Sequence, residues 1–506
     1  MFIQLTRQSG QALYLQVAEQ LRTKIEDGEL IPGIRLPASR VLAKKLNVNR
    51  ITVVNAYAEL EAEGLVVSRK GSGTFVATLS LPPIPALKSY RPPFWQERHP
   101  RSANQMVAEM MRLARRPGII SFAGGAPASE FLPVNEFRRA LNDVLRQDGA
   151  AALQYEEAAG YLPLREYIAA YLQAQNIQAT SSNILITAGC QQAVDIVLRV
   201  LAQGEDNTII IEDPCYLGLL DQVASRRITP IGIPHDEHGM LTHHLESLIL
   251  RHHPRLIYVT PSFHNPTGRT MPLARRRELL EIATRYGVPI LEDASYDELY
   301  YDDLKLPTLK SLDQADLVFH AAGYSKTLAP GIRIGYLVVP PMLYDRIIAT
   351  KQTADILTAP LNQRALYTYL KSGHFSEHLA EVRAAYRTRR EAMQAAVKRY
   401  LPADATWQAP AGGIYLWLEM PPGGPTATDL YLSAINYNVA FAIGSVFSAS
   451  GAYTHGVRLN FAEHAPEVIE EGMRRLGKAW AELLSRPTQK PTSPQAVNHH
   501  PMLHIL

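Results

Sequence analysis

From Ile119 onward, short apolar segments rich in β-branched residues alternate with stretches of helical periodicity. Segments that are apolar on both faces are typical of parallel strands covered by helices. This alternation predicts an α/β domain with a mostly parallel sheet, because parallel neighbours need helical crossovers. Two later segments predict strands of a smaller C-terminal α+β subdomain. The large-domain segments are NILITA, TIIIEDP, RLIYVTP, VPILEDA and LVFHAAGYS, and the later ones are GGIYLWLEM and GVRLNFA.

The first 77 residues have a different pattern, typical of a winged helix-turn-helix. A helix from Leu13 ends at Asp27-Gly28, and a short helix follows in ASRVLAKKL. Asn49 is placed to cap a longer third helix. The segment LVVSRKGSGTFVA then predicts a hairpin around Gly-Ser-Gly, which would form a basic wing.

Between these regions, residues 78–118 contain seven prolines among charged and aromatic residues, which predicts a linker. We therefore expect a DNA-binding module at 1–77, the linker at 78–118, a large domain at 119–484 and a disordered tail at 485–506. The tail histidines fit either a metal-binding tract or, more simply, a solvated tail. With only two cysteines, Cys190 and Cys215, a disulfide framework or a four-thiolate zinc site is excluded, and we expect no metal site.

The net charge of +3 is unevenly distributed along the 506 residues. Residues 1–118 carry 17 Lys+Arg and 9 Asp+Glu, or +8, and the remainder carries 34 and 39, or −5. The basic end is typical of a module that meets a polyanion such as double-stranded DNA. No apolar run is long enough to span a membrane, and the first residues lack a signal-peptide core, so a cytoplasmic protein is expected.

Polar motifs follow several predicted strands, where ligands bind in open α/β sheets. Cys190 and Gln191 open a helix whose free N-H groups could hold a phosphate. Asn265 stands in HNPTG, where the turn itself requires only the proline and glycine. Asp293 follows VPILE with Tyr296 three residues on, and it could equally be a helix cap.

The segment GYSKTLAPGIRIG is the most informative. Ser325 and Lys326 are predicted at the end of a strand, and Arg333 follows seven residues after the lysine. A lysine among apolar strands can lose its proton and attack an aldehyde. Ser325 and Arg333 could bind the phosphate of that aldehyde, although a surface loop lysine is the simpler alternative for Lys326 alone.

Taken together, GCQQA, DPCY, HNPTG, EDASY, SKTLAPGIRIG and VRLNFA resemble the pyridoxal-phosphate aminotransferases of fold type I. The resemblance implies pyridoxal 5'-phosphate as cofactor and Lys326 as its covalent attachment. It also implies that Arg458 binds a substrate α-carboxylate, and that Tyr155 reaches the phosphate in the neighbouring subunit of a homodimer. The remaining cofactor residues that it implies are Asp293 at the ring nitrogen, Asn265 and Tyr296 at the ring hydroxyl, Tyr216 stacked on the ring, and Cys190, Gln191, Ser325 and Arg333 around the phosphate.

The segment from Pro32 to Val76 resembles the GntR-type winged helix over its whole length. That resemblance implies DNA contacts by Arg40 and Arg50, entry of the helix after Asn49 into the major groove, and approach of the hairpin near Gly73 to the minor groove. Thr52 also suits a base or phosphate contact.

A GntR-type module joined to an aminotransferase-like body resembles the MocR/GabR regulators. The resemblance implies a transcription regulator that senses an amine, an amino acid or the cofactor itself. A working aminotransferase with an attached DNA-binding module remains the alternative, because every matched cofactor residue is present. A free-standing metabolic aminotransferase would leave residues 1–77 without a role.

Overall fold

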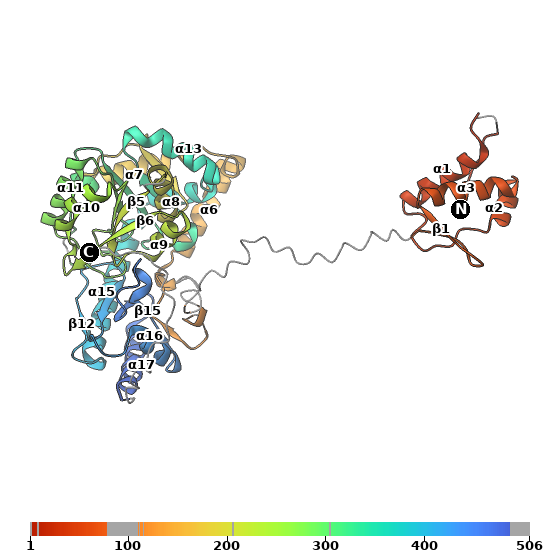
Figure 1. Cartoon of the computed structure of the whole chain (residues 1–506). Helices are drawn as coiled ribbons and strands as arrows, with labels where there is room; N and C mark the ends of the chain where they lie inside the picture. The colour runs from red at the N-terminus through yellow and green to blue at the C-terminus, as the bar shows by residue number, and fades with distance from the viewer. Residues whose placement is uncertain are drawn as a thin grey trace. The chain divides into compact units, whose positions relative to one another are not determined.

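A computed structural model describes most of the chain and divides it into two compact units, Met1–Pro100 and Arg101–Leu506 (Figure 1). The linker expected at 78–118 lies outside the described residues except at its end, and so does the tail expected at 485–506 except for Ser485. The described residues are 3–7, 10–77, 110, 112–114, 116–204, 207–302 and 305–485.

The N-terminal unit is a three-helix winged fold. Its helices are α1 (Leu13–Glu26), α2 (Ser39–Leu46) and α3 (Arg50–Ala62), and the antiparallel pair β1 (Val66–Arg69) and β2 (Gly73–Val76) forms the predicted wing. The core of this unit is built from apolar side chains at helical spacing, including Val17, Leu21, Leu42, Val53 and Leu60.

The turn between α2 and α3 follows from two asparagines. Asn47 ends α2 in the left-handed conformation, with φ of 51°, which asparagine tolerates better than most residues. The side chain of Asn49 accepts a hydrogen bond from the backbone N-H of Ile51 and caps α3 as predicted. Ala38, before α2, provides no such cap.

The larger unit is built on an eight-stranded sheet in the order β4-β11-β10-β9-β8-β5-β6-β7. Neighbours are parallel except that β11 is antiparallel to both β4 and β10, and β7 is antiparallel to β6. The sheet is therefore mostly parallel. Its strands are β4 (Ile184–Thr187), β5 (Thr208–Asp213), β6 (Thr229–Asp236), β7 (Gly239–Met240), β8 (Ile257–Val259), β9 (Ile290–Asp293), β10 (Val318–Gly323) and β11 (Gly335–Val338).

Both faces of this sheet are buried, which explains the continuous apolar strands. In β9, Leu291 packs into the cluster that contains α8, whereas its neighbour Ile290 packs into the cluster that contains α10 and α11. Successive side chains of a strand point to opposite faces. Asp293 therefore lies on the side of α8. The helices of the large domain are α6 (Val134–Asp148), α7 (Leu162–Gln173), α8 (Cys190–Leu201), α9 (Leu217–Ser225), α10 (Leu245–His252), α11 (Leu273–Tyr286), α12 (Leu309–Leu312), α13 (Tyr344–Asp355) and α14 (Pro360–Lys371).

A smaller subdomain follows, gathered at one end of the unit in the blue part of Figure 1. Its four-stranded sheet has the order β12-β13-β16-β15, with antiparallel neighbours, and it packs with α15 (His374–Tyr400), α16 (Ala427–Asn436) and α17 (Pro466–Ser485). A separate parallel pair, β3 (Ile120–Ser121) with β14 (Val439–Ala440), joins the start of the unit to this subdomain. The remaining strands are β12 (Thr406–Trp407), β13 (Tyr415–Glu419), β15 (Ala442–Ile443) and β16 (Gly456–Asn460).

Within the described ranges, no helix combines the length and the apolar character that crossing a membrane would need.

Candidate functional site

The carboxyl ends of β4, β8, β9 and β10 meet at a cavity of about 480 Å³. Its walls come from the large sheet, from the segment 123–125 and from the small subdomain. Ten residues singled out in the sequence line it together: Cys190, Gln191, Tyr216, Asn265, Asp293, Tyr296, Ser325, Lys326, Arg333 and Arg458.

Asp293 is a buried carboxylate held by several donors. Its Oδ2 accepts a 2.7 Å hydrogen bond from the Tyr258 hydroxyl, and its Oδ1 accepts from the hydroxyl and backbone N-H of Ser295 at 2.6 and 3.0 Å. The thiol of Cys190 lies 3.4 Å from Oδ1. The helix-cap alternative is wrong, since no helix begins at this position. Hydrogen bonds to a carboxylate favour its charged form.

Lys326 lies in the turn after β10 and reaches the cavity. The strand ends at Gly323, so the expectation that Ser325 and Lys326 end a strand is wrong by two to three residues. The lysine Nζ donates a 2.5 Å hydrogen bond to the carbonyl oxygen of Gly125. A Cβ on Gly125 would collide with the Tyr415 hydroxyl, so the absence of a side chain at Gly125 lets Tyr415 pack against this segment.

An anion-binding corner forms where α8 begins. Arg333 donates through Nη1 to the Ser325 hydroxyl at 3.3 Å and through Nη2 to the Ala188 carbonyl at 2.9 Å. Gly189 precedes the helix with φ of 97°, and a Cβ there would lie 2.7 Å from Arg333 Nη2. A guanidinium, a hydroxyl and a helix N-terminus together suit a phosphate.

Gln191 makes contacts within the protein rather than pointing freely at this corner. Its Oε1 accepts a 2.9 Å hydrogen bond from the Tyr216 hydroxyl, and its Nε2 donates to the Gly218 carbonyl at 3.0 Å. Gln191 therefore positions the ring of Tyr216 over the cavity. Sequence reasoning did not find this contact.

The opposite side of the cavity contains a linked polar group around Arg458. Arg458 donates to Asn265 Oδ1 at 2.8 Å and to the Ala123 carbonyl at 2.7 Å, whereas its Nε has no partner in the described part of the chain. The guanidinium carbon lies 4.2 Å from the centre of the Tyr415 ring and 4.7 Å from that of Phe447. Arg458 is thus oriented by two hydrogen bonds and two aromatic rings, and its buried Nε is left without an acceptor in the described part of the chain.

Two tyrosines next to this group have pKa values displaced in opposite directions. Burial would raise the pKa of Tyr415, but the charges of Arg458 and Lys326 outweigh burial and lower it. Burial, with Tyr415 nearby, raises the pKa of Tyr296 well above its usual value. Their hydroxyls lie 3.4 Å apart, so Tyr415 is the one suited to give up a proton.

Tyr415, Tyr258 and Ser295 belong to the site, but the sequence had not indicated them. Tyr258 and Tyr415 stand inside segments that were interpreted only as strands, and Ser295 stands between two motif residues. The alternation of strand side chains could have placed Tyr415 on one face of its strand, but not against Tyr296.

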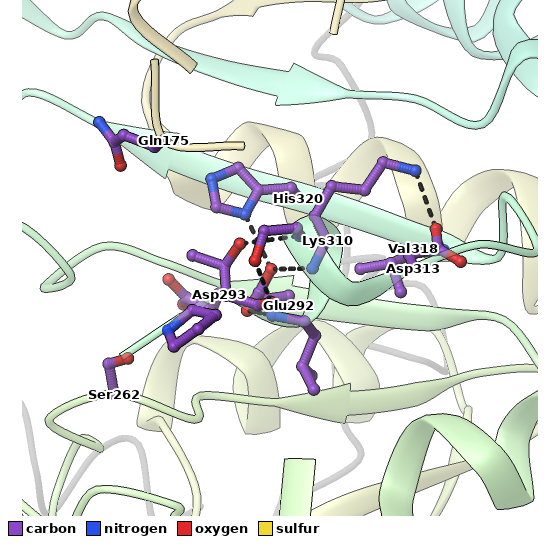
Figure 2. A network of polar contacts seen from close by, with 12 residues as sticks. Gln175, Ser262, Glu292, Asp293, Lys310, Asp313, Val318 and His320 are labelled. Atoms are coloured by element: carbon purple, nitrogen blue, oxygen red, sulfur yellow. Dashed lines mark hydrogen bonds and ion pairs between the residues drawn. The ribbon is translucent and has the colours of Figure 1, made fainter. Parts of the chain in front are cut away.

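Behind Asp293, its neighbour Glu292 belongs to a separate structural network (Figure 2). Glu292 accepts from the backbone N-H groups of Leu309 and Lys310 and contacts His320 Nδ1 at 2.9 Å. Lys310 in turn pairs with Asp313 at 2.9 Å. This network fixes β9 and α12 from the face opposite the cavity.

Tyr155 is outside the cavity of its own chain and is 81% exposed. Its expected action in a neighbouring subunit stays a prediction.

The N-terminal unit presents its predicted DNA contacts on the outside. Arg40 in α2 and Arg50 at the start of α3 are exposed. Thr52, two residues after Arg50 in α3, is half-buried. Arg50 Nε lies 3.4 Å from the Ser39 hydroxyl, which links the two helices. Gly73 opens β2 with φ of 110°, where a Cβ would lie 2.8 Å from Arg35 Nε.

Two family models match the chain. "Aminotransferase class I and II" matches residues 117–476, and "Bacterial regulatory proteins, gntR family" matches residues 13–76. The chain belongs to the class I and II aminotransferase family. Its N-terminal unit is a gntR-type DNA-binding winged helix, so the architecture is that of the MocR-like regulators.

The relatives of this aminotransferase-family chain include both enzymes and regulators. A 2-aminoadipate transaminase of Thermus thermophilus is 37% identical over 402 residues, which cover 78% of this chain and 99% of the relative. A protein named uncharacterized HTH-type transcriptional regulator YdfD, of Bacillus subtilis, is 32% identical over 481 residues, covering 94% and 97%. Among solved structures, LysN, an α-aminoadipate aminotransferase of Thermus thermophilus complexed with N-(5'-phosphopyridoxyl)-L-leucine, matches with a TM-score of 0.70 and 36% identity over 75% of this chain and 95% of that one.

Family membership identifies pyridoxal phosphate as the cofactor, and the cavity fits it. The buried carboxylate of Asp293 suits a protonated ring nitrogen, and the corner at Arg333 suits the phosphate. Lys326 supplies the amine between them.

Proposed function

We propose that this protein is a transcription regulator that binds double-stranded DNA through its winged helix and senses an amino acid or amine, or the cofactor itself, through its aminotransferase-type body. The observation that carries the proposal is the presence of a complete cofactor cavity and a gntR-type module in one chain. Relatives named as regulators share nearly the whole length, which supports the same division of labour.

The cofactor, when bound, supplies an aldehyde that amines attack and a ring that withdraws electrons. Lys326 is its attachment in the proposal, and Asp293 keeps a proton on the ring nitrogen. Asn265 and Tyr296 bind the ring hydroxyl, and Tyr216 stacks on the ring. Ser325, Arg333 and the first N-H groups of α8 at Cys190 and Gln191 bind the phosphate.

Arg458 points to an amino acid as effector. Its guanidinium lines the cavity and is only 5% exposed, and a carboxylate is the group that pairs most strongly with a buried guanidinium. The neighbouring wall is apolar and contains Phe441, Ile443, Val446 and Phe447. An amino acid with an apolar side chain fits this wall better than one with a second charge, because a second charge would lose its water there.

Regulation requires that the effector favours one of two states. In the proposed homodimer, effector binding changes how the two bodies meet, and with them the separation at which the paired winged helices bind half-sites. By thermodynamic linkage, DNA must then change the affinity for the effector by the same factor.

The test uses the full-length protein loaded with cofactor and an operator selected from a random DNA library. Operator affinity and the absorbance of the cofactor are followed while candidate amino acids and amines are added. We expect one compound to shift both, and we expect Arg458→Ala to weaken both responses together. Tyr437→Phe, outside the cavity, serves as a control. An operator affinity indifferent to every compound that alters the cofactor spectrum would refute sensing.

An active aminotransferase that carries a DNA-binding module is the second candidate, because the cavity retains Lys326 and an oriented Arg458. Turnover needs a keto acid as second substrate and release of product, whereas sensing needs neither. Multiple rapid turnovers with keto acids, together with unregulated DNA binding, would favour this candidate.

A further inference from the structure

A second polar cluster lies away from the cofactor cavity and consists of Glu212, His235 and His264. It joins β5, β6 and the loop after β8 that carries HNPTG. One ligand atom from each of the three lies within 4.8 Å of the others. The side chains are between 0% and 2% exposed, so water does not reach them freely.

The two imidazoles face opposite oxygens of the same carboxylate. His235 Nε2 lies 3.2 Å from Glu212 Oε1, and His264 Nε2 lies 3.3 Å from Glu212 Oε2. Neither contact has hydrogen-bond geometry, and both nitrogens of His235 and Nε2 of His264 have no partner in the described part of the chain. A buried polar group left unpaired costs about 1 to 3 kcal/mol, so three at one point need an explanation.

We propose that Glu212, His235 and His264 bind a divalent transition-metal ion, with Zn²⁺ as the best match. Zinc takes imidazole nitrogen and carboxylate oxygen at about 2.0 to 2.2 Å, so ligand atoms in a tetrahedral site lie about 3.3 Å apart. Each oxygen of Glu212 has this spacing to one imidazole nitrogen, Oε1 to His235 Nε2 at 3.2 Å and Oε2 to His264 Nε2 at 3.3 Å. Both carboxylate oxygens of Glu212, together with the two imidazole nitrogens, would complete a closed four-coordinate site.

Contacts around the cluster support two of the three ligands. His264 Nδ1 lies 2.8 Å from the Thr267 hydroxyl, which fixes the ring and directs Nε2 toward Glu212. Glu212 Oε2 also accepts a 2.7 Å hydrogen bond from the backbone N-H of Thr260. His235 lacks such an outer partner. The positive charge of Arg269 acts on both imidazoles and opposes binding, which disfavours weakly held ions such as Mg²⁺.

The ion would tie two strands to the loop that presents Asn265 next to Arg458. Its role is therefore structural and distinct from the amine chemistry of the cavity. It does not depend on the proposed regulatory function.

The experiment measures metal content in the full-length, tag-free protein produced in zinc-supplemented medium, because a closed site fills during folding. After chelator treatment and gel filtration, elemental analysis should give one zinc per chain. His235→Gln and Glu212→Gln should each reduce the content at least tenfold. His243→Ala, which removes an exposed histidine, and a triple replacement of His499, His500 and His504 by alanine should retain it.

X-ray absorption at the zinc edge of the wild-type protein provides a second measurement that needs no variant. It should show imidazole nitrogen and carboxylate oxygen as ligands. Absence of zinc from the wild-type protein, or zinc that is retained in His235→Gln and lost in the tail variant, would overturn the proposal. If Glu212, His235 and His264 only share protons with one another and bind no ion, the wild-type protein will contain no zinc.

Discussion

At the residue scale, two buried aspartates near β9 differ in how their charge is stabilised. Asp293 accepts from Tyr258 and Ser295, whereas neither carboxylate oxygen of Asp297 has a hydrogen-bond partner in the described structure. Burial, together with the charge of Glu292, raises the pKa of Asp297 to about 6. Asp293 is therefore held by hydrogen-bond donors, whereas Asp297 is buried without one.

The raised pKa of Asp297 predicts a pH-dependent stability. Folded Asp297 holds its proton up to about pH 6, whereas an unfolded aspartate loses it near pH 3.9, so its contribution falls as pH rises between these values. Because asparagine does not ionise, we expect Asp297→Asn to avoid this loss. Its free energy of unfolding at neutral pH should exceed that of the wild type by up to about 3 kcal/mol. Urea unfolding at pH 4.5 and 7.5 measures the change.

Glu298 is the matched control with the opposite sign. Burial raises its pKa, but Lys305 and Arg383 outweigh burial and lower it, so its contribution is present at neutral pH and is lost on acidification. Glu298→Gln should therefore destabilise most at pH 7.5. Identical pH profiles for both variants would contradict this assignment.

Lys326 carries a second prediction at this scale. Lys326→Ala should abolish the covalent lysine link and leave some cofactor bound through Asp293 and Arg333. Borohydride reduction followed by peptide mass analysis locates the link, and the exposed Lys371→Ala variant should behave as wild type. A pyridoxyl group on another lysine in the wild-type protein would show the assignment to be wrong.

At the scale of elements, a helix N-terminus lies at each of the two proposed ligand surfaces. The start of α8 faces the corner at Arg333, and the start of α3, capped by Asn49, presents Arg50 next to Ser39 of α2. The positive end of a helix favours an anion in each case, although at α3 the side chain of Asn49 already accepts the N-H of Ile51, whereas Gly189 before α8 provides no side-chain cap.

The α2–α3 arrangement predicts two different effects on DNA. Arg50→Ala should reduce specific affinity by about 1 to 3 kcal/mol if Arg50 binds a base. Arg40→Ala should lower the salt slope of binding by about 0.9 if Arg40 neutralises one phosphate. Fluorescence anisotropy against salt measures both. Lys24 lies on α1 and pairs with Glu29. The control Lys24→Gln should change neither the specific affinity nor the salt slope. Wild-type affinity for DNA in both arginine variants would show that the assignment of this DNA interface is wrong.

At the scale of the whole molecule, the exposed Tyr155 predicts an assembly in which each cofactor site uses two chains. Tyr155→Ala and Lys326→Ala homodimers should both bind cofactor poorly. In mixed dimers one site contains both changes and the other is intact. We expect the purified mixed dimers to carry half of the wild-type covalent cofactor, measured by mass analysis after reduction. No recovery in the mixed dimers would mean that Tyr155 acts in its own chain, and a Tyr155→Ala homodimer that binds cofactor normally would mean that Tyr155 does not act at the site.

The sequence by itself determined the elements of this protein. The strands of NILITA, RLIYVTP and GVRLNFA, the hairpin wing and the cap at Asn49 all follow from local periodicity and turn chemistry, which act over a few residues. Several residues of the cofactor cavity, among them Asn265, Asp293 and Lys326, could be assembled in advance because they lie at or just after the ends of strands that meet at one edge of the sheet, whereas Arg458, within β16, was placed only by the family resemblance.

Tertiary structure alone decided which distant side chains meet. β11 lies antiparallel between β4 and β10, although nothing in its sequence indicates which strands it pairs with. Tyr415 meets Tyr296 across 119 residues, and Glu212 meets His235 and His264 across three separate segments. Local propensity contains no information about such pairings, because they depend on how whole sheets and helices pack. The contacts that tune the charges of the site therefore became visible only in the folded chain.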